Sequence, residues 1–188
     1  MLLIINTQDS FVYNIVEIVR LYRNIDFDVV LPHDLQNIDI DKYNAIMLSP
    51  GAGLPSDYPQ VQSLLRSVYK EKSIFGVCLG MQFIAELFDL KLVQLAAPKH
   101  GHTSYLILQN DSLIFQGYEN GSEIGRYHSW VVDRKFTSND IDIIATDEDD
   151  NIMAIEHNKF PIYGVQFHPE SIITTNGNLI LRNWLDTI

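Results

Sequence analysis

Residues 73–83 read Ser-Ile-Phe-Gly-Val-Cys-Leu-Gly-Met-Gln-Phe, and this stretch says most about how the 188-residue chain folds. An apolar run ends at Val77, and apolar residues at helical spacing begin at Leu79. A strand that becomes a helix across the single residue Cys78 is typical of α/β proteins. The sequence therefore predicts a strand over 73–77 and a helix over 79–88.

The segments before this stretch continue the same alternation of short apolar runs and amphipathic segments. Strands are predicted at 2–5, 27–31 and 45–49, and helices at about 10–22 and 58–71. Strands that alternate with helices in this way form a parallel sheet with helices on both of its faces.

The pattern changes after Leu92, where short β-like runs are separated by polar turns. These runs lie at 104–108, 123–127, 141–145, 151–156 and 162–167, and a final helix is predicted at 178–185. We expect a single α/β domain over residues 1–188, because no repeat or linker divides the chain. Its open, mostly parallel central sheet should carry additional antiparallel strands in its second half.

Composition excludes several classes of function. Thirteen Lys and Arg against 24 Asp and Glu give a net charge of −11, which argues against a nucleic-acid partner. No stretch is apolar enough to span a membrane, and residues 1–6 resemble a buried strand more than a signal peptide. A single cysteine allows no intrachain disulfide, so we expect a cytoplasmic protein with no membrane partner. The acidic stretch 147–150 lacks the glycine of a calcium loop and is interpreted as a solvated polar turn.

Cys78 is the candidate nucleophile. It occupies the centre of Gly-Val-Cys-Leu-Gly, a thiol version of the nucleophile elbow, at the start of the predicted helix. The positive end of the helix dipole stabilises a thiolate, and the N–H of Leu79 would face a developing oxyanion. The alternative is a small buried hydrophobe, which is what a lone cysteine usually is.

His168 and Glu170 are the candidate base and its orienting group. They follow the predicted strand 162–167 in the stretch Gln-Phe-His-Pro-Glu-Ser. A cysteine nucleophile needs a general base, and a carboxylate fixes the tautomer of the imidazole. An isolated histidine is more often structural, but here the elbow is present as well.

A glycine-rich loop follows the predicted strand 45–49 and reads Ser-Pro-Gly-Ala-Gly-Leu-Pro. Loops at the carboxyl ends of parallel strands commonly bind ligands, so Gly51 is a candidate second oxyanion donor. A plain turn is the alternative. The loop lacks the Gly-Lys-Ser/Thr of a phosphate-binding loop and the third glycine of a dinucleotide fingerprint.

With these motifs the chain resembles the class I (triad) glutamine amidotransferases. Within them it is most similar to the small subunit of anthranilate synthase and aminodeoxychorismate (para-aminobenzoate) synthase. Further segments carry the resemblance: Asp9-Ser10-Phe11, His100-Gly101-His102-Thr103-Ser104 and Arg126-Tyr127-His128-Ser129.

The resemblance implies specific residue roles. Cys78, His168 and Glu170 would form the triad, with backbone N–H groups of Gly51 and Leu79 facing the oxyanion. L-Glutamine would be bound by the loop Gly51-Ala52-Gly53, by Gln82 and by the backbone of Ser129 and Trp130. Residues 9–11 and 100–104 would lie near a partner or support the site. No cofactor and no metal are implied.

The implied activity is hydrolysis of glutamine through a cysteinyl thioester, with ammonia passed to a separate chorismate-binding synthase subunit. Either anthranilate or aminodeoxychorismate fits, so the pathway is that of tryptophan or folate. Two other functions stay open: a stand-alone γ-glutamyl or cysteine hydrolase of the same fold, and a catalytically idle regulatory subunit.

Four positions depart from the family pattern: Gln8, Ala52, His102 and Trp130 stand where Tyr, Pro, Lys and Leu are usual. Ala52 should leave the loop less rigid, and a backbone role of Trp130 would survive the larger side chain. His102 replaces a permanent cation, which puts the usual interface contact in question. None of the four is a triad residue.

Overall fold

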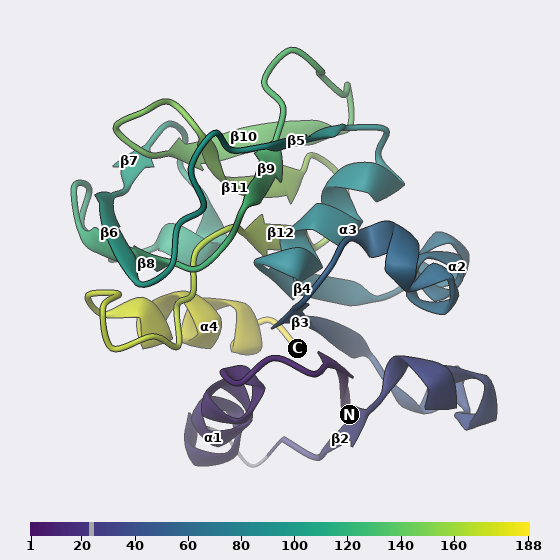
Figure 1. Ribbon diagram of the computed structural model, residues 1–188. Coiled ribbons are helices and arrows are strands. Elements are labelled where there is room, and N and C mark those ends of the chain that lie inside the picture. Colours follow the sequence, from purple (N-terminus) through teal and green to yellow (C-terminus); the bar gives the residue numbers. More distant parts are fainter. Residues whose placement is uncertain (23–24) are drawn as a thin grey trace.

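A central sheet of eight strands organises the computed structural model, which describes residues 1–22 and 25–188 (Figure 1). The strand order is β2-β1-β3-β4-β12-β11-β10-β7, parallel from β2 to β12 and antiparallel beyond it. The strands are β1 Leu2–Thr7, β2 Phe27–Val30, β3 Ala45–Gly51, β4 Ser73–Val77, β7 Ile107–Leu108, β10 Ile141–Thr146, β11 Ile152–His157 and β12 Ile162–Val165. The predicted parallel core and antiparallel second half are confirmed.

Within the described residues, four α-helices cover the two faces of this sheet. They are α1 Val12–Tyr22, α2 Pro59–Val68, α3 Leu79–Leu87 and α4 Gly177–Leu185. Short 3-10 helices lie at Pro32–Asn37, Ile40–Lys42, Pro55–Asp57 and Leu113–Phe115. None of the helices in the described ranges is both long and apolar enough to cross a bilayer.

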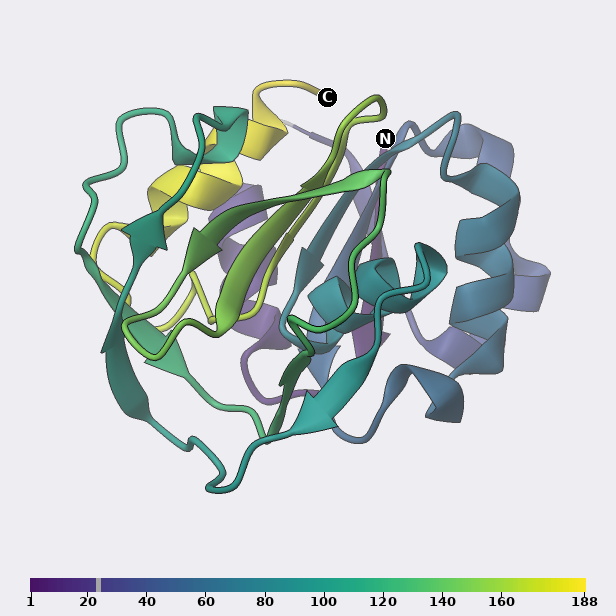
Figure 2. The ribbon, with the colours of Figure 1, turned by 90° about the horizontal axis from the view of Figure 1, so that it is seen from above.

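Strand alternation explains how both faces are filled. Successive side chains of a strand point to opposite faces, so Leu2 and Ile4 pack with α1 and α4, while Leu3 and Ile5 pack with α2 and α3. All four side chains are fully buried, as expected for a parallel strand covered on both sides. Figure 2 shows α4 on one side of the sheet and α2 on the other.

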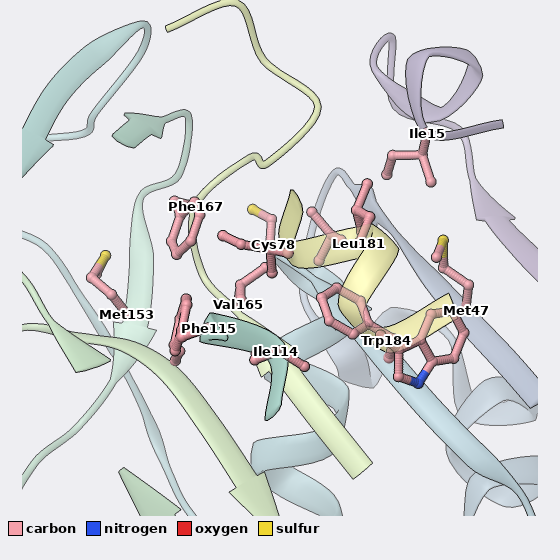
Figure 3. Close-up of a cluster of buried hydrophobic side chains, with 14 of the residues drawn as sticks. Ile15, Met47, Cys78, Ile114, Phe115, Met153, Val165, Phe167, Leu181 and Trp184 are labelled. Carbon is pink, nitrogen blue, oxygen red and sulfur yellow. The ribbon is translucent and has the colours of Figure 1, made fainter. Parts of the chain in front are cut away.

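The core between the sheet and α4 extends to the end of β4. Trp184 of α4 packs on Phe75 at a ring-centroid distance of 5.3 Å, and its indole N–H donates to Ser73. Cys78 belongs to the same buried cluster as Val165 and Leu181 (Figure 3). The candidate nucleophile therefore packs against the hydrophobic core between the sheet and α4.

Two small antiparallel ribbons complete the second half: β5 Leu92–Gln94 with β9 Trp130–Val132, and β6 His102–Tyr105 with β8 Glu123–Arg126. The single strand predicted over 104–108 is wrong, because the chain changes sheets at the buried residue Leu106. The strands β5 and β9 were not predicted. Three-residue strands carry too little alternation to be recognised.

The acidic stretch 147–150 forms a turn, as predicted, but its first residue is not solvated. Asp147 is 1% exposed and pairs with the fully buried Arg126 of β8. It also accepts hydrogen bonds from the backbone and side chain of Asn151. This buried pair ties β8 to the turn between β10 and β11.

Candidate active site

Cys78 lies at a sharp turn between β4 and α3. Its φ of 55° and ψ of −105° are unfavourable for a residue with a Cβ atom, as at a nucleophile elbow. Its N–H donates to the carbonyl of Val165 in β12 at 2.7 Å, which fixes the turn against the neighbouring strand. The residue directly precedes the first turn of α3, where backbone N–H groups have no acceptor within the helix.

The glycines on either side of Cys78 are required by close packing. A Cβ atom on Gly76 would lie 2.4 Å from the carbonyl of Gly80, and one on Gly80 would lie 2.3 Å from the carbonyl oxygen of Leu48. These glycines let the start of α3 contact β4 and β3 directly. The motif therefore sets the position of the helix end behind the sulfur.

His168 and Glu170 follow β12, the strand beside β4. Nδ1 of His168 is 2.7 Å from Oε1 of Glu170, and both side chains are buried. The N–H of His168 donates to the carbonyl of Gly125, and the hydroxyl of Thr174 donates to the carbonyl of His168. The turn that carries the histidine is thus held from two sides.

Two aromatic rings orient the imidazole. Phe11 and Tyr127 contact His168 edge-on at centroid distances of 5.3 and 4.9 Å, and they contact each other at 4.9 Å. The Tyr127 hydroxyl shares a hydrogen bond of 3.0 Å with Ser171. Phe11, from the segment 9–11, thereby supports the candidate base.

The electrostatics of His168 favour its charged form. Burial lowers its pKa, but hydrogen bonding and charge from Cys78 and Glu170 act in the opposite direction, and the pKa lies well above the ordinary value of 6.5. Nε2 is close enough to Cys78 for this effect, yet it has no hydrogen bond of good geometry in the described part of the chain. Catalytic hydrogen bonds are often long before substrate binds.

The glycine-rich loop reaches the nucleophile from β3. The Thr7 hydroxyl donates to the carbonyl of Pro50 at 2.7 Å, and the Ser49 hydroxyl accepts from the Thr7 N–H. A Cβ atom on Gly51 would lie 2.3 Å from Thr7 Oγ1 and 2.7 Å from Leu79 Cδ2. Only glycine fits there, so its backbone lies directly beside the start of α3.

A pocket of about 500 Å³ opens in front of Cys78. It is lined by Gly51, Ala52, Gly53, Leu54, Asp57, Cys78, Leu79, Gln82, Gln94, His100, Tyr127, His128, Ser129 and Trp130. The structure thus brings every predicted substrate-binding residue to one pocket, and its size suits a small ligand. His168 and Glu170 are not among the lining residues. A larger hollow at residues 108–118 has no Cys or His in its wall.

Gln82 is held by a defined set of hydrogen bonds. Its Nε2 donates to the carbonyl of Trp130 at 3.1 Å and to Oε1 of Gln166 at 3.2 Å. The amide of Gln166 in turn places Nε2 at 3.6 Å from Cys78 Sγ. The Trp130 contact uses the backbone, so the large side chain at this position does not alter it.

His128 connects this set to the buried Arg126. Arg126 Nε donates to His128 Nε2 at 3.1 Å, and His128 Nδ1 is 3.0 Å from the same Trp130 carbonyl. Burial, followed by the charge of Arg126, lowers the pKa of His128 to about 3. The ring is therefore neutral at ordinary pH and donates through Nδ1.

Ser129 and Ala52, which are also predicted to bind substrate, have backbone carbonyls that already accept hydrogen bonds within the protein. The Ser129 carbonyl accepts from the N–H of Leu95, and the Ala52 carbonyl accepts from the Tyr58 hydroxyl. His102 is exposed on β6, and the expectation that the segment 100–104 lies near a partner or supports the site stays a prediction.

Sequence reasoning gave no role to Gln166, Thr7, His128 or Tyr127. A signal was present for Gln166, which is a polar residue within the apolar run 162–167 and is fully buried. The hydrogen-bond partner Ser49 of Thr7 is distant in sequence, so no local pattern reveals it. The partners of His128, Arg126 and the Trp130 carbonyl, are only two residues away, but a side-chain contact of this kind leaves no mark on the periodicity of the sequence.

Comparison with known families identifies the class of protein to which this site belongs. The family model "Glutamine amidotransferase class-I" matches residues 3–188, and the chain belongs to this family. It is accordingly a glutamine amidotransferase.

Individual relatives within this family are similar to the chain over its full length. "Anthranilate synthase component 2" of Lactococcus lactis is 37% identical over 191 residues, which cover 100% of this chain and 95% of the relative. The Saccharolobus solfataricus protein of the same name is 38% identical and covers 99% and 98%. The solved structure of a Thermotoga maritima glutamine amidotransferase aligns with a TM-score of 0.77 at 17% identity, covering 99% and 80%, and supports the fold.

Proposed function

We propose that this chain is the glutaminase subunit of a chorismate-using synthase of the anthranilate synthase type. The contact that carries the proposal is the buried Glu170–His168 pair, which interacts with Cys78, a residue that lines a pocket large enough for glutamine. Full-length relatives named as anthranilate synthase component 2 supply the choice of synthase.

The reaction begins with attack of the Cys78 thiolate on the side-chain carboxamide carbon of glutamine. The carbonyl π electrons move to oxygen, and N–H groups of Leu79 and Gly51 stabilise that oxyanion. Collapse of the tetrahedral intermediate breaks the C–N bond, and His168 protonates the leaving nitrogen to give ammonia and a γ-glutamyl thioester.

Hydrolysis then regenerates the Cys78 thiolate. His168 takes a proton from water, the resulting hydroxide attacks the thioester carbonyl, and collapse expels the Cys78 thiolate and releases glutamate. Glu170 accepts from Nδ1 of His168 throughout, which directs Nε2 towards the sulfur and the substrate.

Gln82 supports binding of the substrate. Both hydrogens of its amide nitrogen are used by Trp130 and Gln166, so its Oε1 is the atom left to accept from a donor group of glutamine. Asp57 and His100 line the same pocket and would face the polar end of the amino acid.

The test is reconstitution with candidate synthase subunits. Wild type should release glutamate from glutamine and support product formation with an anthranilate synthase component, whereas Cys78→Ser should support product formation only when free ammonia is added. Equal glutamine-dependent activity in both proteins would refute the proposal.

The same assay separates the alternatives. Aminodeoxychorismate as the product with its own synthase would assign the other chorismate pathway. Turnover of other γ-glutamyl amides without any synthase would indicate a stand-alone hydrolase. An idle subunit would leave Cys78 unlabelled by a glutamine-like electrophile such as a chloroketone.

A further inference from the structure

A chain of hydrogen bonds runs from Arg126 to Cys78, and its first members fix its direction. A guanidinium only donates, so His128 must accept at Nε2 and carry its proton on Nδ1. The Trp130 carbonyl only accepts, and it receives the His128 Nδ1–H.

The same carbonyl fixes the orientation of Gln82. Its amide nitrogen must face Trp130, and that nitrogen also lies 3.2 Å from the amide of Gln166. The atom of Gln166 on that side must therefore be the oxygen, since two amide NH₂ groups would repel each other.

The orientation of Gln166 follows from that of Gln82. With its oxygen on Gln82, its NH₂ group is 3.6 Å from Cys78 Sγ. Gln166 is fully buried and Cys78 is 5% exposed, so little water competes for this contact. An N–H donor stabilises a thiolate more than a neutral thiol, because the bond is then assisted by charge.

We propose that Gln166 is a further catalytic residue, which donates a hydrogen bond to the reacting sulfur and stabilises the Cys78 thiolate. Through its oxygen it also holds Gln82 in the orientation that leaves Gln82 Oε1 for the substrate. The catalytic part rests on the proposed function.

Other titratable groups surround the sulfur and must be kept constant in a test. They are His168 and Glu170 from the segment after β12, His128 and Tyr127 between β8 and β9, and His100 and Asp57 in the pocket wall. Substitutions at position 166 leave all of them in place.

The experiment measures alkylation of Cys78 by iodoacetamide as a function of pH, on the full chain without glutamine or a synthase. Cys78 is the only cysteine, so the rate reports this thiol alone. Gln166→Met keeps the length of the side chain but removes the donor. The apparent pKa of alkylation should rise by about one to two pH units, the size expected for a charge-assisted hydrogen bond. Gln166→Glu places an acidic group beside the sulfur and should raise it further.

Kinetics separate a catalytic from a packing role. With the synthase present, Gln166→Met should lower kcat about 10- to 100-fold and raise KM for glutamine, because Gln82 loses its acceptor. Gln166→Glu should lower kcat while KM stays close to wild type, since a carboxylate oxygen still accepts from Gln82. If Gln166 had only a structural role, both variants would lose thermal stability, but KM for glutamine would not differ between them in this way.

The matched control is Gln62→Met, because Gln62 donates to Glu86 on α3 outside the pocket. Its alkylation profile should match wild type. Unchanged profiles in both position-166 variants would overturn the inference. If the profiles shift but glutamine is never hydrolysed, the hydrogen bond stands and the proposed function fails.

Discussion

His168 and His128 lie close together at residue scale, but their surroundings move the two pKa values in opposite directions. Both rings are buried, which disfavours the cation. Interactions with Cys78 and Glu170 raise the pKa of His168, whereas the charge of the Arg126 guanidinium lowers the pKa of His128. His168 is therefore suited to carry a proton, and the neutral ring of His128 is suited to donate a fixed hydrogen bond.

Glu170→Gln should narrow the pH range of activity from its alkaline side. The carboxylate helps to raise the pKa of His168, so its loss lowers that pKa and the imidazolium is deprotonated at lower pH. The alkaline limb of the kcat/KM profile should move to lower pH, and activity should fall by about 10²-fold. Glu119→Gln, an exposed charge change, is the control. An alkaline limb in its wild-type position would contradict this role.

His128 should make the protein sensitive to acid. Its folded-state pKa of about 3 lies below the ordinary value of 6.5, so the unfolded chain takes up a proton first as the pH falls. The stability gained by keeping the ring neutral is present above 6.5 and is lost between 6.5 and about 3, by up to about 1.4 kcal/mol per pH unit.

Urea unfolding at several pH values checks this expectation. His128→Asn should lose stability less steeply below pH 6.5 than wild type, whatever its stability at neutral pH. His33→Asn removes an exposed imidazole and should keep the wild-type slope. Parallel slopes in wild type and His128→Asn would show that the ring is not the acid-sensitive group.

At the scale of elements, α3 meets the sheet through glycine, and this contact sets the position of the elbow. Gly80 lies against the backbone of β3 and Gly76 against the backbone of α3. No side chain separates the helix start from the strands, so its first N–H groups are held at the level of the sulfur.

Gly80→Ala should therefore disturb both stability and activity. The added Cβ would lie 2.3 Å from the carbonyl oxygen of Leu48, which is backbone and cannot rotate away. Overpacking of this kind costs about 1–3 kcal/mol, measured as a lower urea midpoint, and glutaminase activity should fall with it. Gly121→Asn, at a position with nothing within 4 Å of an added Cβ and a positive φ that Asn tolerates, should change little. An unchanged midpoint for Gly80→Ala would show that α3 can shift freely.

The elements that the sequence predicts well are those with long periodic patterns. Leu2–Ile5 and Ala45–Ser49 are continuous apolar runs, and α1 and α4 have helical spacing. The strands β5 and β9 were not predicted, because they are short and their partners are remote: Leu92 pairs with Val132, and nothing near Leu92 encodes that pairing.

The residues of the candidate site likewise fall into a group that the sequence predicts and a group that it does not. Cys78, His168, Glu170 and the loop at Gly51 belong to compact motifs, and the sequence alone predicts them as site residues. The packing of Tyr127 on the imidazole and the Gln82–Gln166 contact both depend on tertiary structure, which no local pattern encodes. The one signal in the sequence is Gln166 itself, a polar residue within an apolar run.

At the scale of the whole molecule, stability should be graded across the sheet. Every residue of β1 and β4 is buried, whereas β2 is half-exposed and β7 has only two residues at the opposite edge. Local opening requires the least free energy where few buried contacts are broken.

Hydrogen exchange followed by mass spectrometry should detect this gradient. Peptides from β1, β3 and β4 should exchange most slowly, and peptides from β7 and β2 most rapidly. Peptides covering β5 and β9 serve as the reference for a short exposed ribbon. Equal rates in β4 and β7 would mean that the sheet opens as one unit, contrary to the burial pattern.

The pairing of β12 with β4 has a consequence for the order of synthesis. Cys78 and Gln166 are 88 positions apart in the chain, and His168 follows Gln166 closely. Ribosomes add about 5–20 residues per second, so the cysteine emerges seconds before the residues that contact it. During that interval the nascent chain carries an ordinary thiol. Insertion of the late strand β12 between β4 and β11 brings the base and the amide donor to the sulfur, so its reactivity is withheld until most of the polypeptide has been made.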